Sequence, residues 1–370
     1  MSETKFSNFT NEDGSTGPDL VGITSFTSPY YFVPPSGNTA QRPSGEGLAP
    51  GMLRFNTDIG RLEVWRGDHW GTILGESPSL NGGARGLIGG GYVAPATVNT
   101  IDFITISSTG NATDFGDLTQ ARYNLSACSS STRGVFGGGY LIPASVNVNT
   151  IDFITISSTG NASDFGDLTQ ARFYLSACSS STRGVFGGGI APATVNTIDF
   201  ITISSTGNAV DFGDLTQARY ALAACSSSTR GIFGGGYTPA TVNTIDFITI
   251  SSTGNAADFG DLIQVRQVLA ACSSSTRGVF GGGYAPTNVN TIDFITISTT
   301  GNATDFGDLT QARHALAACS SSTRGVFGGG VTVNTIDFIT ISSTGNAVDF
   351  GDLTQARRSV AALSNGHGGL

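Results

Sequence analysis

The sequence predicts an all-β protein built mainly of six copies of one unit, and three observations lead to this class. The string NTIDFITIS occurs six times, at spacings between 44 and 50 residues. The phrases RG-x-x-GGG and DFGDL also occur six times each. The repeated strings are rich in β-branched and aromatic residues and are bounded by Gly, Ser and Asn, as short strands and turns are. Six units with four short strands each predict a β-propeller.

The elements of one unit follow from its local patterns. Residues 101–106 carry apolar side chains on both faces, which is typical of a strand between neighbouring sheets. Residues 107–111 form a turn, and residues 114–118 form a short outer strand. Residues 133–136 form another strand, which ends in three glycines where backbones are expected to crowd. Residues 215–225 fit a helix or a strand equally well.

The order of these elements resembles the kelch repeat. An Arg is followed by a small apolar strand, a turn, an apolar strand with paired glycines, an alternating strand and an outer strand. In this chain one such run comprises Arg122, residues 125–128, residues 135–138, residues 151–156 and residues 164–168. The unit departs from kelch because Trp65 and Trp70 both precede the repeats, so the usual tryptophan of the third strand is missing. The resemblance covers about three-quarters of the chain, and it implies that residues 215–225 contain the innermost strand.

The ends of the array are expected to meet. Six copies of the second, third and fourth strands are present, but only five internal copies of the first. The sixth copy is residues 360–363, close to the C-terminus. If it pairs with the unit that begins at Arg85, no sheet edge is left free. We therefore expect a six-bladed propeller over residues 76–370, closed by the C-terminal strand.

Differences between the copies gather on one side of this expected fold. The turns SSST and SSTGNA share one end of the strands and hardly vary, and we call that end the uniform face. The loop between the second and third strands and the residue after QAR lie at the other end, the varied face. Varied loops on a rigid scaffold are where recognition usually resides, although drift in unconstrained loops gives the same pattern.

Aromatic residues on the varied face are the candidate ligand-binding groups. Their rings could stack on sugar rings, or they could simply pack against the adjacent loop. The candidates that begin the varied loops are Tyr92, Tyr140, Tyr237 and Tyr284. The candidates that follow QAR or QVR are Tyr123, Tyr220 and His314.

The first 75 residues have a different character. Residues 1–50 include stretches rich in Gly, Pro, Ser and Asn and are expected to form an extended attachment arm. Tyr30, Tyr31 and Phe32 form an aromatic cluster within it that is suited to docking on another chain, with packing inside the arm as the alternative. Residues 51–75 are expected to form a small β-hairpin module with its turn at residues 58–60.

This module has a second resemblance. The segment PGMLRFNTDIGRLEVWRGDHWGTI, with the preceding SPYYFVPPSGNTAQRPS, resembles a module of tail-fibre and other virion proteins of bacteriophages. The two segments cover about 45 residues. They imply a virion protein that is attached through its arm to other virion proteins and carries its propeller outward. A module this small is marginal by itself, so homo-oligomerisation or packing on a partner is expected.

Charge and composition exclude several functions. The net charge is −9 with 18 basic residues, which leaves no basic field for nucleic acid or an anionic membrane surface. No apolar run approaches 18 residues, so no membrane insertion is expected. The three histidines share no metal spacing, and near-identical units supply no unique cluster of acid, base or metal ligands. We expect neither an enzyme, a metal site nor a cofactor.

The remaining repeated residues have structural interpretations. Each unit carries one Cys at an equivalent position, which Leu363 fills in the sixth copy, so these are expected to be buried free thiols. Arg122 and its equivalents are expected to pair with aspartates, or alternatively to bind anionic sugars on the varied face. The cysteines are Cys128, Cys178, Cys225, Cys272 and Cys319.

These observations give one functional expectation and one alternative. The chain is expected to be a structural protein of a bacteriophage virion, a tail fibre or appendage that presents its propeller to a host-surface polysaccharide. The alternative is a decoration or connector protein of the virion that binds no receptor. The two differ in whether the varied face is exposed in the particle.

Overall fold

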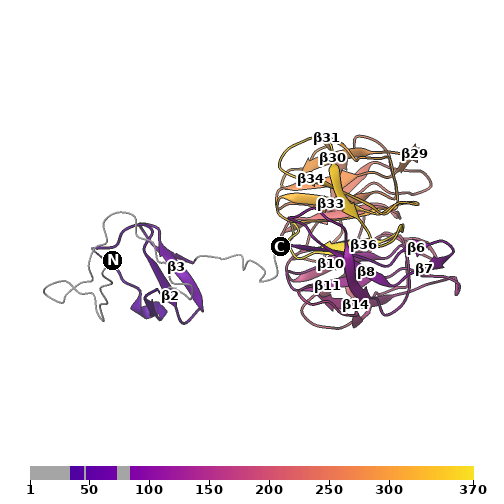
Figure 1. Cartoon of the computed structure of the whole chain (residues 1–370). Coiled ribbons are helices and arrows are strands. Elements are labelled where there is room, and N and C mark those ends of the chain that lie inside the picture. The colour runs from indigo at the N-terminus through magenta and orange to yellow at the C-terminus, as the bar shows by residue number, and fades with distance from the viewer. Residues whose placement is uncertain (1–33, 46, 73–83) are drawn as a thin grey trace, which may run out of the picture. The chain divides into compact units, whose positions relative to one another are not determined.

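The computed structural model describes residues 34–45, 47–72 and 84–370 (Figure 1). The chain divides into two compact units, Met1–Ser77 and Pro78–Leu370. Within the described ranges the single helix is the three-residue 3₁₀ helix η1 (Thr39–Gln41), and all other elements are strands. The all-β prediction is therefore confirmed. No helix in these ranges is long and apolar enough to cross a membrane.

The first unit contains one small sheet. Its strands lie in the order β1-β2-β3-β4, with β1 parallel to β2 and the other pairs antiparallel. The β2–β3 turn includes residues 58–60, where the sequence predicts it. Strand β1 and helix η1 belong to the segment expected to be an extended arm, whereas Tyr30, Tyr31 and Phe32 lie outside the described residues. The strands are β1 (Ser36–Gly37), β2 (Leu53–Asn56), β3 (Arg61–Trp65) and β4 (Trp70–Thr72).

The buried face of this small sheet is polar and its exposed face is apolar, the reverse of the usual arrangement. Arg54, Asn56 and Glu63 are buried, and Glu63 accepts hydrogen bonds from both of the others at 3.1 Å. Glu63 also pairs with Arg42, and the hydrogen bond from Arg42 is the main reason why the pKa of Glu63 is lowered. On the opposite face of β2, Leu53 is 42% exposed. The covered face is thus held by polar contacts and the open face is the apolar one.

The second unit contains six four-stranded antiparallel sheets; in five of them the strands lie in chain order, and in the sixth the C-terminal strand lies beside the first strand of the unit. The innermost strands are β10 (Ser126–Ser129), β16 (Ser176–Ser179), β22 (Ala223–Ser226), β26 (Ala270–Ser273), β32 (Ala317–Ser320) and β36 (Ala361–Ser364). The second strands are β5 (Arg85–Gly89), β11 (Arg133–Gly137), β17 (Arg183–Gly187), β23 (Arg230–Gly234), β27 (Arg277–Gly281) and β33 (Arg324–Gly328).

The outer half of each sheet is equally regular. The third strands are β8 (Thr100–Thr105), β14 (Thr150–Thr155), β20 (Thr197–Thr202), β24 (Thr244–Thr249), β30 (Thr291–Thr296) and β34 (Thr335–Thr340). The fourth strands are β9 (Thr113–Asp117), β15 (Ser163–Asp167), β21 (Val210–Asp214), β25 (Ala257–Asp261), β31 (Thr304–Asp308) and β35 (Val348–Asp352). Residues 215–225 form no helix, and the part of this stretch that is a strand begins at Ala223.

The loops of the varied face carry short hairpins that the sequence did not predict. Each connects the second and third strands of one sheet. They are β6 (Tyr92–Val93) with β7 (Ala96–Thr97), β12 (Tyr140–Leu141) with β13 (Val146–Asn147), β18 (Ile190–Ala191) with β19 (Ala193–Thr194), and β28 (Tyr284–Ala285) with β29 (Thr287–Asn288).

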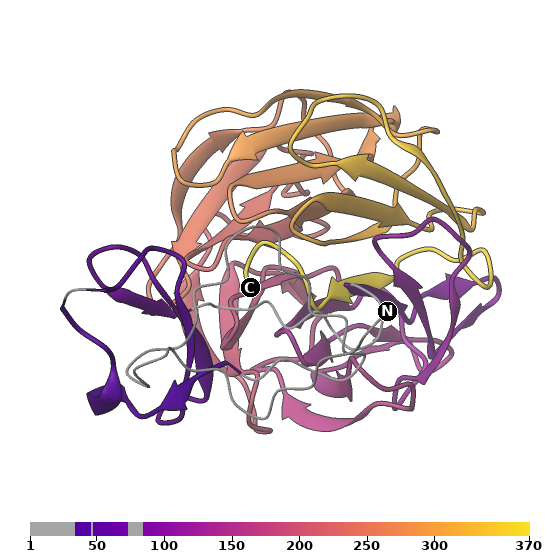
Figure 2. The same ribbon diagram turned by 60° about the vertical axis from the view of Figure 1, so that its left-hand side comes forward.

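Each innermost strand lies next to the innermost strands of the two neighbouring sheets. Strand β36, from the C-terminal end, pairs with β5 and completes the sheet β36-β5-β8-β9. It also lies against β10 on one side and β32 on the other. In Figure 2 the sheets of this unit are arranged about the C-terminal segment. This arrangement of repeated four-stranded sheets is consistent with a β-propeller-like fold.

Adjacent sheets share apolar cores. Val135 and Ile151 of one sheet pack in one cluster with Phe186 and Ile201 of the next. Most of the glycines in the triplet at the end of each second strand lie where little space is left. At Gly138, with φ of 67°, an added Cβ would approach the carbonyl oxygen of Arg172 to 2.6 Å. Both the conformation and the space therefore favour glycine there.

A buried ion pair lies inside each sheet. Arg122 approaches Asp152 at 3.1 Å, and both side chains are fully buried. Thr119, which follows the outer strand of the preceding sheet, donates to Asp152 Oδ1 at 2.7 Å. The aspartate thus joins two sheets, as the structural interpretation of these residues predicts. The equivalent pairs are Arg172–Asp199, Arg219–Asp246, Arg266–Asp293, Arg313–Asp337 and Arg357–Asp102.

Candidate ligand-binding site

The innermost strands line a narrow channel, and its two ends differ. Three small cavities follow one another along it, with volumes of about 50, 100 and 70 Å³. Pockets that enclose an organic ligand are about 300–1,000 Å³. The interior of the channel is therefore too small to be a ligand pocket, and the surface around its end at the varied face becomes the candidate.

The end at the uniform face is closed by serines. Each serine that ends an innermost strand donates its hydroxyl to the carbonyl oxygen of the preceding one, at 2.5–2.8 Å, so that six such bonds form a ring. We call this the serine ring. Its members are Ser129, Ser179, Ser226, Ser273, Ser320 and Ser364.

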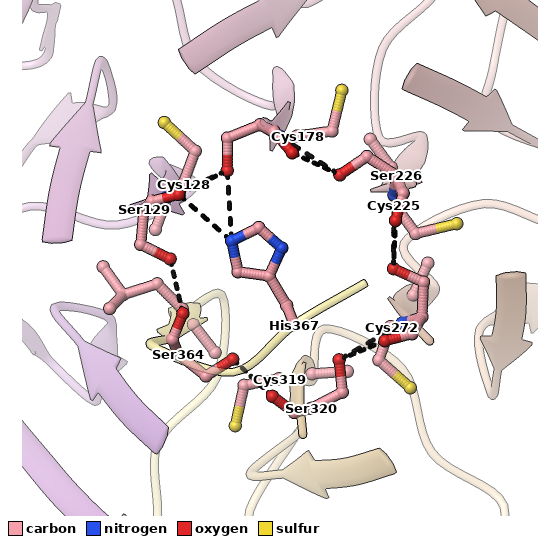
Figure 3. Close-up of a pocket in the computed structure, with 18 of the residues that line it drawn as sticks. Cys128, Ser129, Cys178, Cys225, Ser226, Cys272, Cys319, Ser320, Ser364 and His367 are labelled. Atoms are coloured by element: carbon pink, nitrogen blue, oxygen red, sulfur yellow. Dashed lines mark hydrogen bonds between the residues drawn. The ribbon is translucent and has the colours of Figure 1, made fainter. Parts of the chain in front are cut away.

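His367 occupies the centre of the serine ring (Figure 3). Its Nε2 lies 3.1 Å from the carbonyl oxygen of Ser129, and its Nδ1 accepts a hydrogen bond from the amide of Gly369 at 3.1 Å. Burial lowers the pKa of His367 to about 4. At Gly369 an added Cβ would collide with the carbonyl oxygen of Ser179. The C-terminal residues thus form a close-fitting plug at this end.

The end at the varied face is closed by backbone instead. Six residues with φ between 52° and 59° each donate their amide N–H to the carbonyl oxygen of the equivalent residue in a neighbouring sheet, at 2.7–3.0 Å. We call this the rim. The same residues, with the leucines and valine that follow them, line the outermost cavity. The rim consists of Asn124, Tyr174, Ala221, Val268, Ala315 and Ser359.

The structure brings the predicted ligand-binding residues together around the rim. In five sheets, the residue after QAR or QVR and the first residue of the varied loop form an antiparallel bridge. The pairs are Tyr123 with Tyr140, Phe173 with Ile190, Tyr220 with Tyr237, Gln267 with Tyr284, and Arg358 with Tyr92. Tyr284 is exposed, and the other candidates are partly buried. The phenols of Tyr123 and Tyr220 have raised pKa values, mainly because of burial, so they stay neutral.

Most of these rings form one continuous series, which we call the aromatic arc. Consecutive ring centroids are 5.1–5.7 Å apart, the separation expected for aromatic pairs. The arc spans four of the six sheets. The remaining aromatic pair, Tyr284 with His314, lies 5.8 Å apart in the other two sheets. The members of the arc, in spatial order, are Tyr92, Tyr123, Tyr140, Phe173, Tyr174, Tyr220 and Tyr237.

One cation lies at the end of the arc. The guanidinium of Arg358 lies over the ring of Tyr92, 5.0 Å from its centroid. Among the described residues of the second unit, 84–370, no carboxylate forms an ion pair with Arg358. His314 is nearby, and burial followed by the charge of Arg358 lowers its pKa, so it is neutral at neutral pH. Arg358 is therefore the fixed positive charge of this surface.

Other predicted groups are not available to a ligand. Arg122 is fully buried and paired with Asp152, so the alternative that arginines of this set bind sugars is wrong. The five cysteines are free and buried, as predicted, and burial raises the pKa of Cys178 to about 12. In Figure 3 the labelled sulfur atoms point away from the imidazole of His367. In the described part of the chain, no group of three His, Cys, Asp or Glu residues could hold a metal ion.

Several residues of the channel and of the surface around its rim were not among the sequence-predicted site residues, including Phe173 and Arg358. Tyr174 joins the two halves of the arc, Asn124 lies on the rim, and His367 fills the serine ring. Asn124 and Tyr174 directly follow varied residues, which is the one signal that could have pointed to them. His367 follows the last repeat, and no sequence pattern around it indicates its position in the structure. No known protein-family model matches the chain, and no curated protein is significantly similar to it in sequence.

Proposed function

We propose that this chain is a structural protein of a bacteriophage virion, a tail fibre or appendage, and that it presents a closed six-bladed β-propeller to a glycan on the host surface. In this proposal the aromatic arc and the rim form the glycan-binding surface. The first unit holds the protein to other virion proteins, through the arm that contains Tyr30, Tyr31 and Phe32.

Two complete hydrogen-bonded rings support the closed propeller. The serine ring and the rim each contain six bonds, and each includes a bond from the first internal repeat to the C-terminal segment, at Ser364 in the ring and at Ser359 in the rim. A ring closed at both ends of the channel has no free inner edge, which is how propellers protect their sheets. A rigid ring of this kind also fixes the varied loops in one arrangement.

The aromatic arc is the observation that carries the proposal of glycan binding. Aromatic faces stack on the apolar faces of sugar rings, while their polar edges form hydrogen bonds. Seven rings in contact, partly exposed and concentrated on four of the six sheets, are more than packing of separate loops requires. Because the arc covers only part of the circle, it has two distinct ends, and the sugars of a bound chain would lie along it from one end to the other.

Association with a virion is supported by the sequence of the first unit. The hairpin of residues 51–75 and the aromatic cluster before it resemble modules of phage tail fibres. The apolar outer face of β2, where Phe55 is 36% exposed, fits a module that packs against another chain.

The test of glycan binding uses the purified full-length chain on an array of bacterial surface polysaccharides. Tyr123→Ala combined with Tyr220→Ala should weaken binding at least about tenfold, because two stacking faces are lost. The control is Val210→Ala combined with Val348→Ala. These valines are 58% and 57% exposed on outer strands, and their replacement should leave binding unchanged.

The alternative function predicts a different result. A decoration or connector protein would bind none of the polysaccharides, or would bind them equally well after the tyrosine changes. Association with the virion has a separate test. An antibody against the second unit should label particles purified from cells that produce this protein, and unlabelled particles would contradict the assignment.

A further inference from the structure

The end of the aromatic arc next to Arg358 differs from the rest of the varied face. Here the C-terminal end of the repeat array meets its beginning, because strand β36 pairs with β5. The sequence is irregular at this junction. The last unit reads QARRS where another unit reads QARYA, and its varied loop is shortened to residues 331–333. Together with Asn124 of the first internal repeat, Arg358 and Ser359 bring a cation, an amide and a hydroxyl to this part of the rim.

Asn124 provides a donor without a partner at this point. It is 6% exposed and lines the outermost cavity of the channel. Its Nδ2 has no hydrogen-bond partner among the described residues. A buried amide that forms no hydrogen bond costs free energy unless something else pairs with it.

The backbone conformation does not explain this asparagine. Its φ of 52° lies in the left-handed region, where Asn is tolerated better than most residues. The equivalent positions, however, hold Tyr174, Ala221 and Val268 with almost the same φ. The fold therefore does not require Asn at this position, and its amide is free to serve a ligand.

Arg358 directly precedes Ser359, the residue with which Asn124 pairs. The amide N–H of Asn124 donates to the carbonyl oxygen of Ser359 at 3.0 Å, and Ser359 also lines the cavity. The Arg358 guanidinium lies against Tyr92, whose ring is 5.7 Å from that of Tyr123. A cation, a donor amide and two aromatic rings thus come from residues that adjoin one another at this corner of the rim.

Acidic side chains are absent from this place although the protein as a whole is acidic. None of the residues that line the outermost cavity is Asp or Glu. Asp102 and its equivalents are buried in ion pairs, while Asp114 and Asp117 lie on an outer strand. Among Tyr92, Tyr123, Asn124, Arg358 and Ser359, which form this corner, Arg358 is the charged residue.

We propose that this corner of the rim binds a carboxylate-bearing sugar, such as a hexuronic acid, within or at the end of the glycan. Arg358 pairs with the carboxylate, the Asn124 amide donates to a sugar oxygen, and Tyr92 and Tyr123 stack on the ring. The inference rests on the proposed glycan binding and names the class of sugar that the site selects.

The experiment compares acidic oligosaccharides with their neutral counterparts. Tetramers of galacturonic, glucuronic and mannuronic acid are titrated into the full-length protein, each beside its methyl ester. At least one acid should bind, its methyl ester should bind at least about tenfold more weakly, and binding of the acid should weaken with added salt.

Variants then assign the effect to this corner. Arg358→Gln and Asn124→Ala should each lower affinity for the acid about tenfold or more, and Arg358→Gln should remove its advantage over the ester. The matched control is Arg61→Gln, which removes the same charge from an exposed arginine of the first unit and should change nothing.

The possible failures are distinguishable. If acids and esters bind equally well and binding depends on Tyr123 but not on Arg358, the acidic-sugar inference is overturned while glycan binding stands. If none of the three acids binds although neutral polysaccharides do, the inference fails in the same way. If no glycan of either kind binds, both proposals fail.

Discussion

The two ends of the channel are closed by the same number of hydrogen bonds but by different atoms. In the serine ring, side-chain hydroxyls donate to the neighbouring carbonyl oxygens. In the rim, backbone amides make the equivalent bonds. Because a hydroxyl is needed at one end and any amide suffices at the other, all six positions of the serine ring are Ser, whereas the rim holds five different residue types. The fold constrains side chains at the first end and leaves them free at the second.

This difference indicates where a ligand can be recognised without cost to the fold. At the uniform end, the polar groups of the ring are already paired with one another. At the varied end, the phenols, the guanidinium of Arg358 and the amide of Asn124 are not required by the rim. If the two kinds of position differ in this way, substitutions at the first kind destabilise the fold and substitutions at the second kind do not.

The largest effect is expected from two adjacent arginines. Arg357 is buried and pairs with Asp102 at 3.0 Å, whereas Arg358 lies on the varied face. Arg357→Met leaves Asp102 buried without its cation and should cost about 3–5 kcal/mol of unfolding free energy. Arg358→Met should change it by no more than about 0.5 kcal/mol. Denaturant unfolding of both variants measures the difference, and equal losses would mean that Arg358 is structural.

A smaller effect is expected in the serine ring. Ser226 donates to the carbonyl oxygen of Ser179 at 2.7 Å and accepts from the amide of Ser179 at 3.3 Å. Ser226→Ala leaves both groups buried without a partner and should cost about 1–3 kcal/mol. Val268→Ala on the rim keeps its backbone bond to Ala221 and should cost about 0.5 kcal/mol. If the two variants are equally stable, the contrast between side-chain and backbone closure is wrong.

Much of this arrangement could be predicted from the sequence because repetition makes weak local signals readable. The strands, the two faces and the buried thiols follow from comparing copies. What could not be predicted depends on a single residue in a three-dimensional ring. His367 follows the last repeat, so no comparison of copies reveals it, and Asn124 is unusual only once its neighbours on the rim are known. The polar interior around Glu63 was also missed, because alternation in β2 does not tell which face is covered.

One irregular copy allows a stabilising prediction. In five sheets a Thr hydroxyl donates to the Oδ1 of a buried Asp at 2.7 Å. Ile263 takes the place of this Thr opposite Asp293, whose Oδ1 has no partner among the described residues and whose pKa is raised, mainly by burial. Ile263→Thr should restore the bond and raise the unfolding free energy by about 0.5–1.5 kcal/mol. Val265→Thr, at another exposed site in the same loop, is the control and should bring no such gain.

The smallest effect on global stability is expected from pH, because the titrating residue, His367, follows the last strand and belongs to no sheet. His367 must be neutral in the ring, since its Nδ1 accepts from Gly369 and a doubly protonated imidazole has no acceptor. Its folded pKa of about 4 lies below the ordinary value of about 6.5, so a released tail binds a proton that the plugged tail does not. The plug should therefore be fully stable above about pH 6.5 and weaken progressively as the pH falls toward 4.

Titration of the imidazole by NMR measures this effect. The control is His367→Gln, a variant whose C-terminal tail should not respond to pH. A titration of His367 near pH 6.5 would show instead that the imidazole is not held in the ring.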